Sequence, residues 1–145
     1  MLVKKTNIWC WLIIKFMNEI TIKELQKLVT KFRDDRDWRR FHHPKDLSMS
    51  IAIEAAELME LFQWHKQTIG DREEMKKEFK KYIQDQQLMQ RIQEELADVL
   101  IYCLFLTDVL KIDLSEAIKM KIKMNEKKYP IQEVKKRDKK RDSKY

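Results

Sequence analysis

Apolar residues recur every three or four positions along most of the chain, which is the spacing of one face of an α-helix. The clearest stripe consists of Ile22, Leu25, Leu28, Val29 and Phe32. The segment just before it, Thr21 to Glu24, has the pattern of a capping box, in which the two side chains satisfy free amides of the first helical turn. These patterns predict a first helix that ends near Asp35.

Further helical segments follow after a connection over residues 37–43, which Pro44 closes. The predicted elements are a second helix capped by Asp46 and ending near Lys66 before Gly70, a charged third helix from Asp71, a long fourth helix over Leu88–Leu110, and a fifth helix capped by Asp113 and stopped by Pro130. We therefore predict an all-α fold, a four-helix bundle-type protomer with one short extra helix.

The composition supports this class and excludes others. The 145 residues include one glycine and two prolines, and 43% of them are hydrophobic and 38% charged. A chain of this kind forms one domain with a substantial core, but it has too few glycines for the turns of β-sandwiches or doubly wound α/β folds. P-loops and dinucleotide-binding loops are excluded for the same reason. Any phosphate chemistry must therefore use metal ions and side chains.

We expect residues 1–16 to be an N-terminal extension that precedes the organised part of the chain. Their apolar run, Asn7–Ile14, is interrupted by Lys15 and is too short to span a bilayer. We therefore expect no stable membrane association, with a weak surface anchor as the alternative. Cys10 and Cys103 are far apart, and no Cys/His cluster surrounds either, which favours a reducing, cytoplasmic location.

Positive charge is concentrated at the opposite end of the chain. The formal net charge is +7, and residues 131–145 carry +4 of it. We expect these residues to form a flexible, disordered basic tail that follows a single domain over residues 17–130. The rest of the chain is nearly balanced, so nucleic-acid binding is not expected beyond nonspecific contacts of the tail.

Two pairs of carboxylates lie inside apolar helical segments. Glu54 and Glu57 are one turn apart in the second predicted helix, and Glu95 and Asp98 have the same spacing in the fourth. Buried carboxylates repel each other and lose hydration unless a cation compensates them. Similar pairs are common on solvated surfaces, but the apolar surroundings here favour metal ligands. Oxygen ligands of this kind suit Mg²⁺.

Four motifs follow one another along the chain: Arg36-Asp-Trp38-Arg-Arg-Phe41-His42-His43-Pro44, Glu54-x-x-Glu57-Leu-x-Glu60-Leu-Phe62-Gln-Trp64, Glu95-Leu-x-Asp98-Val-Leu-Ile-Tyr102 and Lys121-x-x-x-Asn125-x-x-x-Tyr129-Pro130. Together they resemble the MazG-like all-α NTP pyrophosphohydrolases, and within them the dCTP pyrophosphatase branch. The resemblance covers Thr21 to Pro130. It implies a homodimer or homotetramer that uses Mg²⁺ to convert a (deoxy)nucleoside triphosphate, in particular dCTP or a modified dCTP, to the monophosphate and pyrophosphate.

The resemblance also implies roles for individual residues. Glu54, Glu57, Glu95 and Asp98 correspond to ligands of Mg²⁺, for which Mn²⁺ could substitute, and Glu57 is in addition a candidate general base. Contacts to the substrate are implied for Trp38, His42, Trp64, Tyr102, Lys121 and Asn125.

Two features depart from the family pattern. Val29 stands where dedicated dCTP enzymes carry a histidine on the first helix, and the segment between Glu57 and Glu95 is longer than in compact members. The preferred base therefore stays open, with dUTP or another nucleotide as the alternative substrate. An alternative of another class is a non-catalytic helical module that binds nucleic acid or a partner through the basic tail.

Overall fold

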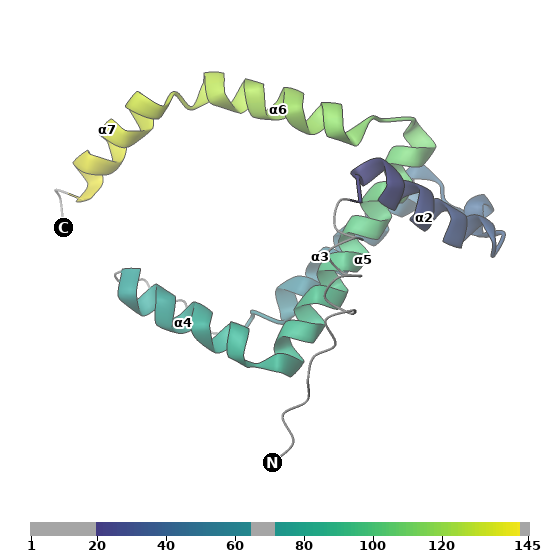
Figure 1. Ribbon diagram of the computed structural model, residues 1–145, viewed down its shortest axis with the longest axis horizontal. Coiled ribbons are helices and arrows are strands. Elements are labelled where there is room, and N and C mark those ends of the chain that lie inside the picture. The colour runs from purple at the N-terminus through teal and green to yellow at the C-terminus, as the bar shows by residue number, and fades with distance from the viewer. Residues whose placement is uncertain (1–19, 65–71, 143–145) are drawn as a thin grey trace, which may run out of the picture. The chain divides into compact units, whose positions relative to one another are not determined.

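The structure is a computed structural model of the chain that describes residues 20–64 and 72–142 (Figure 1). All regular secondary structure in these ranges is helical, as the sequence predicts. The chain divides into two compact units, residues 1–110 and 111–145, which we describe separately. The predicted extension over residues 1–16, Cys10, Lys66 and Gly70 lie outside the described residues. The second predicted helix ends earlier than the expected position near Lys66, because its last helical residue is Glu60 and Leu61 is its C-cap.

The first unit begins with α2 (Ile22–Asp34). Its start confirms the predicted capping box, because the Thr21 hydroxyl accepts from the Glu24 amide and the Glu24 carboxylate accepts from the Thr21 amide at 2.7 Å. A short 3-10 turn, η1 (Trp38–Phe41), occupies the predicted connection. Asp37 precedes it in the left-handed conformation, with φ of 55°, which turns the chain toward the next helix.

Two helices, α3 (Pro44–Glu60) and α5 (Gln86–Leu110), pack along each other and form the centre of this unit (Figure 1). They are antiparallel: His42, just before α3, stacks on Phe105 near the end of α5, whereas Leu61, just after α3, shares a pocket with Leu88 near the start of α5. The buried apolar side chains of the described residues are Leu47, Leu61, Leu104 and Phe105.

The start of α3 differs from the prediction that Asp46 caps it. His43 is the N-cap, and its Nδ1 accepts from the Lys45 amide at 3.4 Å. Pro44 takes the first helical position, where its missing N–H costs nothing and its fixed φ suits a helix. Asp46 therefore lies inside the first turn, where its charge still favours the helix N-terminus.

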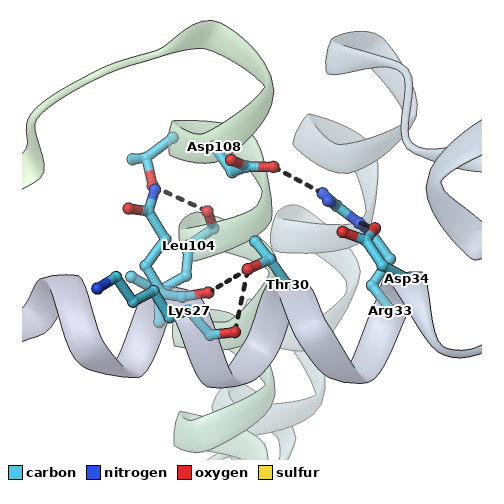
Figure 2. A network of polar contacts seen from close by, with 8 residues as sticks. Lys27, Thr30, Arg33, Asp34, Leu104 and Asp108 are labelled. Atoms are coloured by element: carbon cyan, nitrogen blue, oxygen red, sulfur yellow. Dashed lines mark hydrogen bonds and ion pairs between the residues drawn. The ribbon is translucent and has the colours of Figure 1, made fainter.

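Polar contacts join α2 to the end of α5 (Figure 2). The Gln26 amide donates to the Thr107 hydroxyl at 3.0 Å, and this hydroxyl donates to the Leu104 carbonyl at 2.8 Å. The remaining helix among the described residues of this unit, α4 (Arg72–Gln84), leads directly into α5 through Asp85, whose carboxylate accepts from the Leu88 amide. The charged third helix that the sequence predicts is therefore confirmed.

The second unit contains α6 (Leu114–Lys128) and α7 (Ile131–Asp142). Asp113 caps α6, as predicted, by accepting from the Glu116 amide at 3.0 Å. The structure differs from the prediction of a disordered tail over residues 131–145, because α7 occupies most of this segment. Pro130 ends α6 and its carbonyl then accepts from the amides of Glu133 and Val134, so it starts the next helix. None of the helices described here is long and apolar enough to cross a membrane.

Candidate metal and nucleotide site

Three carboxylates meet at the middle of the α3–α5 pair. Glu54 of α3 and Glu95 and Asp98 of α5 each present an oxygen atom within 4.8 Å of the others. Glu95 and Asp98 lie one turn apart on α5, so they share the face that meets α3. Of the residues that the structure describes, these three form the one group of carboxylate, histidine or cysteine side chains arranged in this way. We call them the acidic cluster.

The electrostatics of the acidic cluster are unfavourable without a cation. Burial raises the pKa of Glu54, and the negative charges of Glu57, Asp98 and Glu95 raise it further. Within the described ranges, no lysine or arginine forms an ion pair with a member of the cluster. Carboxylate oxygens are the ligands that Mg²⁺ and Mn²⁺ prefer, so these residues fit a divalent metal ion.

Glu57 lies beside the acidic cluster and not within it. It is one turn further along α3 and exposed, and it lines an open depression on the outer face of this helix together with Ile53 and Glu60. Its charge nevertheless acts on Glu54, since it contributes to the raised pKa of that residue. The structure therefore brings three of the four predicted metal ligands together and leaves the fourth at the edge of the site.

The raised pKa of Glu54 predicts a pH-dependent stability of the metal-free protein. An ordinary glutamate has a pKa of 4.5. Between this pH and the higher pKa of the folded state, the folded chain binds more protons than the unfolded chain, so the free energy of unfolding should fall as the pH rises. Mg²⁺ should offset this loss by compensating the ionised carboxylates.

Thermal unfolding from pH 4.5 upward, with Mg²⁺ and with EDTA, measures this effect. We expect the stabilisation by Mg²⁺ to grow with pH in the wild-type chain and to be much weaker in Glu54→Gln. Unfolding temperatures that are the same with Mg²⁺ and with EDTA at every pH would contradict the assignment of a metal site.

An aromatic pocket of about 430 Å³ adjoins the acidic cluster. Its lining residues come from α2, from the η1 connection and from α5: Leu28, Val29, Phe32, Trp38, His42, Asp98, Ile101, Tyr102 and Phe105. Asp98 belongs both to this lining and to the acidic cluster. A ligand in the pocket therefore lies next to any cation that the cluster holds.

Aromatic contacts hold the walls of this pocket. Trp38 meets Phe32 edge-on at 5.9 Å between ring centroids, and the Arg36 guanidinium lies 3.7 Å from the centroid of the Phe32 ring. On the other element, Tyr102 meets Phe105 edge-on at 6.1 Å. The pocket thus has flat apolar walls that suit a planar ring.

The other predicted substrate residues are Trp64, Lys121 and Asn125. Trp64 is 85% exposed and lines a separate pocket with Glu60 and Arg91, at the end of α3 far from Trp38. Lys121 and Asn125 are exposed, one turn apart on α6, and belong to the second unit. Of the predicted substrate contacts, the structure brings together Trp38, His42 and Tyr102.

Some pocket residues were missed by the sequence reasoning. Phe32 was assigned to the apolar stripe of the first helix, and Phe105 was not singled out. The signal for Phe105 is the spacing Asp98, Tyr102, Phe105, which places all three residues on one face of α5.

Comparisons with known proteins match this chain to one family. Residues 49–142 match the model of the MazG-like family. Mouse dCTP pyrophosphatase 1 is 35% identical over 118 residues, which are 81% of this chain and 64% of the mouse protein. The human protein of the same name is 35% identical over 117 residues, which are 79% of this chain and 62% of its own length. The chain thus spans less than two thirds of these curated relatives.

A solved structure is also similar. The crystal structure of a pyrophosphatase from Archaeoglobus fulgidus DSM 4304 has 42% sequence identity and a TM-score of 0.64, and the match covers 78% of this chain and 95% of that one. The likeness therefore extends over nearly the whole archaeal chain.

Proposed function

Because the chain belongs to the MazG-like family, we propose that it is a metal-dependent nucleoside triphosphate pyrophosphohydrolase, which releases a nucleoside monophosphate and pyrophosphate. The observation that carries this proposal is the position of Asp98, which lies in both the acidic cluster and the aromatic pocket. A nucleotide joins a flat base to a chain of phosphates, so it matches an aromatic pocket that adjoins a cation site.

Glu54, Glu95 and Asp98 would hold the divalent cation, with Mg²⁺ as our first choice and Mn²⁺ as a substitute. Bound there, the cation would neutralise phosphate charge and lower the pKa of water. Glu57, exposed at the edge of the cluster, remains our candidate general base, which would accept a proton from the attacking water.

The aromatic pocket would take the base of the nucleotide. Trp38 and Tyr102 offer flat surfaces for stacking, which stabilises any base and discriminates little between them. Dedicated dCTP relatives are similar to this chain, so dCTP or a modified dCTP is our preferred substrate. Val29 provides no hydrogen bond on its side of the pocket, which leaves dUTP as the alternative.

We also propose that the active form is a homodimer or homotetramer. Large apolar side chains are exposed along α3 and α5, among them Ile53, Met59 and Leu100. Exposed apolar surface of this extent marks an interaction site. A second copy of the chain would cover this apolar surface. Such an assembly would also allow Trp64 of one copy to line the aromatic pocket of another copy. Lys121 and Asn125 remain proposed contacts to phosphate and sugar.

Product analysis tests the proposed reaction. The chain is incubated with Mg²⁺ and each of the common dNTPs and NTPs, and the products are separated by anion exchange. We expect monophosphate and pyrophosphate, with the highest kcat/KM for dCTP or a modified dCTP. Diphosphate and inorganic phosphate as products would contradict the proposal.

The same panel separates the non-catalytic alternative. A helical module that acts through its basic tail should turn over no nucleotide, and it should bind nucleic acid in a salt-dependent way that is lost when residues 131–145 are removed. Turnover that survives this truncation would instead support the enzyme.

Replacing Trp38 by alanine tests the proposed base site. We expect KM for dCTP to rise about tenfold and kcat to change little, because stacking on the base is lost while the acidic cluster is untouched. Steady-state kinetics measure both values. Phe79→Ala, an exposed aromatic residue of α4, is the matched control and should leave them unchanged. An unchanged KM in Trp38→Ala would place the base elsewhere.

A further inference from the structure

A buried arginine lies next to the aromatic pocket and is not one of its lining residues. Arg33 of α2 is 0% exposed. Its Nε donates to Asp34 Oδ1 at 2.7 Å and its Nη1 donates to Asp108 Oδ2 of α5 at 2.9 Å, and Figure 2 shows the guanidinium between these two carboxylates. The arginine side chain is buried, whereas the side chains of Asp34 and Asp108 remain 47% and 22% exposed. Ion pairs whose carboxylates stay in contact with water contribute little stability. A role for Arg33 is therefore to be found in the side chains that its guanidinium contacts.

Arg33 also contacts the wall of the pocket. Its Cζ lies 5.7 Å from the centroid of the Phe105 ring, within the range of a cation–π interaction. Phe105 is 5% exposed and lines the pocket. The His42 ring stacks on Phe105 at 4.6 Å with an interplanar angle of 25°, and Tyr102 contacts the same ring edge-on. One phenyl ring thus connects Arg33 to two residues that line the pocket.

Stacking on Phe105 is a contact that can orient the His42 ring. Its Nδ1 is buried and has no hydrogen-bond partner among the described residues, so no hydrogen bond at this atom fixes the ring. Burial lowers the pKa of His42 and the charge of Arg33 lowers it further, while Asp34 opposes them. The imidazole is therefore favoured in its neutral form, as a flat surface without charge.

We propose that Arg33 is a positioning residue, which through Phe105 holds His42 and Tyr102 in place as the walls that receive a nucleobase. That the ligand is a nucleobase rests on the function proposed above, whereas the positioning of His42 by Arg33 does not depend on that function. The planar guanidinium is suited to this task because it binds two carboxylates and lies against an aromatic ring at the same time. Lysine keeps the charge but cannot provide this geometry.

The placement of His42 can be measured without substrate. Proton NMR of the His42 imidazole, assigned with a His42→Gln variant, reports the ring current of Phe105. We expect the ring-current shift of wild type to be largely lost in Arg33→Met, reduced in Asp108→Asn, and partly retained in Arg33→Lys. Lys31→Met is the matched control, since Lys31 is an exposed cation on the same helix that pairs with Asp35. It should match wild type.

Kinetics of the same variants test the link to the nucleobase. We expect KM for dCTP to rise about tenfold in Arg33→Met, because displaced pocket walls lose part of the stacking on the base. The kcat of this variant should stay within about twofold of the wild-type value. Arg33→Lys should recover part of the loss. Inhibition by inorganic tripolyphosphate, which has no base, should stay the same in all variants.

Each result decides one step of the proposal. A ring-current shift that survives in Arg33→Met and Asp108→Asn overturns the positioning of His42, and a lost shift with an unchanged KM overturns its role in binding the base. If Arg33→Met does not fold, as judged by circular dichroism, Arg33→Lys and Asp108→Asn decide the matter in the same way. If wild type turns over no nucleotide, the proposed function fails, and the NMR result still decides whether Arg33 places His42.

Discussion

Replacing Glu54 by glutamine is expected to lower the rate of pyrophosphate release by at least about 100-fold, the scale seen when one group that stabilises transition-state charge is removed. Glutamine has the same shape but lacks the charge, so the acidic cluster would hold a divalent cation more weakly. The fold should persist, because the change removes repulsion among Glu54, Glu95 and Asp98. Steady-state kinetics at the Mg²⁺ concentration that just saturates the wild-type protein, and thermal unfolding, measure the two expectations.

Glu94→Gln provides the matched control for this variant. Glu94 is an exposed neighbour of Glu95 on α5, and it accepts a hydrogen bond from Gln90 at 2.8 Å. Its replacement should change turnover by less than about twofold, since it lies outside the acidic cluster. Equal losses in Glu94→Gln and Glu54→Gln, or full activity in Glu54→Gln, would show that the cluster is not the catalytic centre.

Replacing Leu47 by alanine is expected to lower the free energy of unfolding by about 2–5 kcal/mol, the usual cost of a cavity in a packed core. Leu47 is 2% exposed and is one of four buried apolar side chains in the described residues. A core with so few members depends strongly on each of them. The loss also loosens the start of α3, which carries Glu54 further along.

Urea unfolding followed by circular dichroism measures this loss. Ser48→Ala is the control, because Ser48 is the exposed next residue of α3 and donates only to the Lys45 carbonyl. We expect its free energy of unfolding to stay within about 0.5 kcal/mol of wild type, as for most surface substitutions. A Leu47→Ala protein as stable as Ser48→Ala would mean that α3 is held by other contacts.

Helix boundaries were predictable wherever a side chain near the helix end satisfies the first free amides. Thr21 and Asp113 lie directly before helical stripes, and both cap as predicted. The predicted N-cap of α3 was wrong because two sequence signals competed at the start of this helix. Asp46 is a good cap, but Pro44 fits the first helical position and moves the cap to His43, a residue type that rarely has this role.

The C-terminal segment shows the limit of composition as a guide. Residues 131–145 have few apolar residues and a high net charge, which is typical of disorder. The structure nevertheless forms α7 over Ile131–Asp142, with Glu133 in its first turn. Helix formation here needs only local propensity and a start at Pro130, and neither depends on an apolar face.

The acidic cluster was largely predictable because helical spacing alone places Glu95 and Asp98 on one face. Glu54 and Glu57 have the same spacing on α3, but Glu54 joins the acidic cluster while Glu57 is exposed at its edge. Three residues advance a helix by about 300°, so the two residues of each pair differ by about 60° in direction. Which of two carboxylates points at a neighbouring helix depends on how the helices pack, and one sequence does not contain that information.

Long-range pairs could not be read from the sequence. Arg33 lies on a helix with many polar residues, where a charged side chain is expected to be exposed. Its partner Asp108 is 75 positions away, and only the packing of α2 on α5 brings the two together. Trp38 and Trp64 are the opposite case, since both are predicted substrate contacts and they line separate pockets.

A crystal structure with Mn²⁺ and the non-hydrolysable α,β-imido analogue of dCTP tests the proposed metal and nucleotide site most directly. We expect an anomalous peak from Mn²⁺ among Glu54, Glu95 and Asp98, the triphosphate beside it, and the base against Trp38. Mn²⁺ and nucleotide bound together on a different surface, with the acidic cluster and the aromatic pocket free of both, would contradict it.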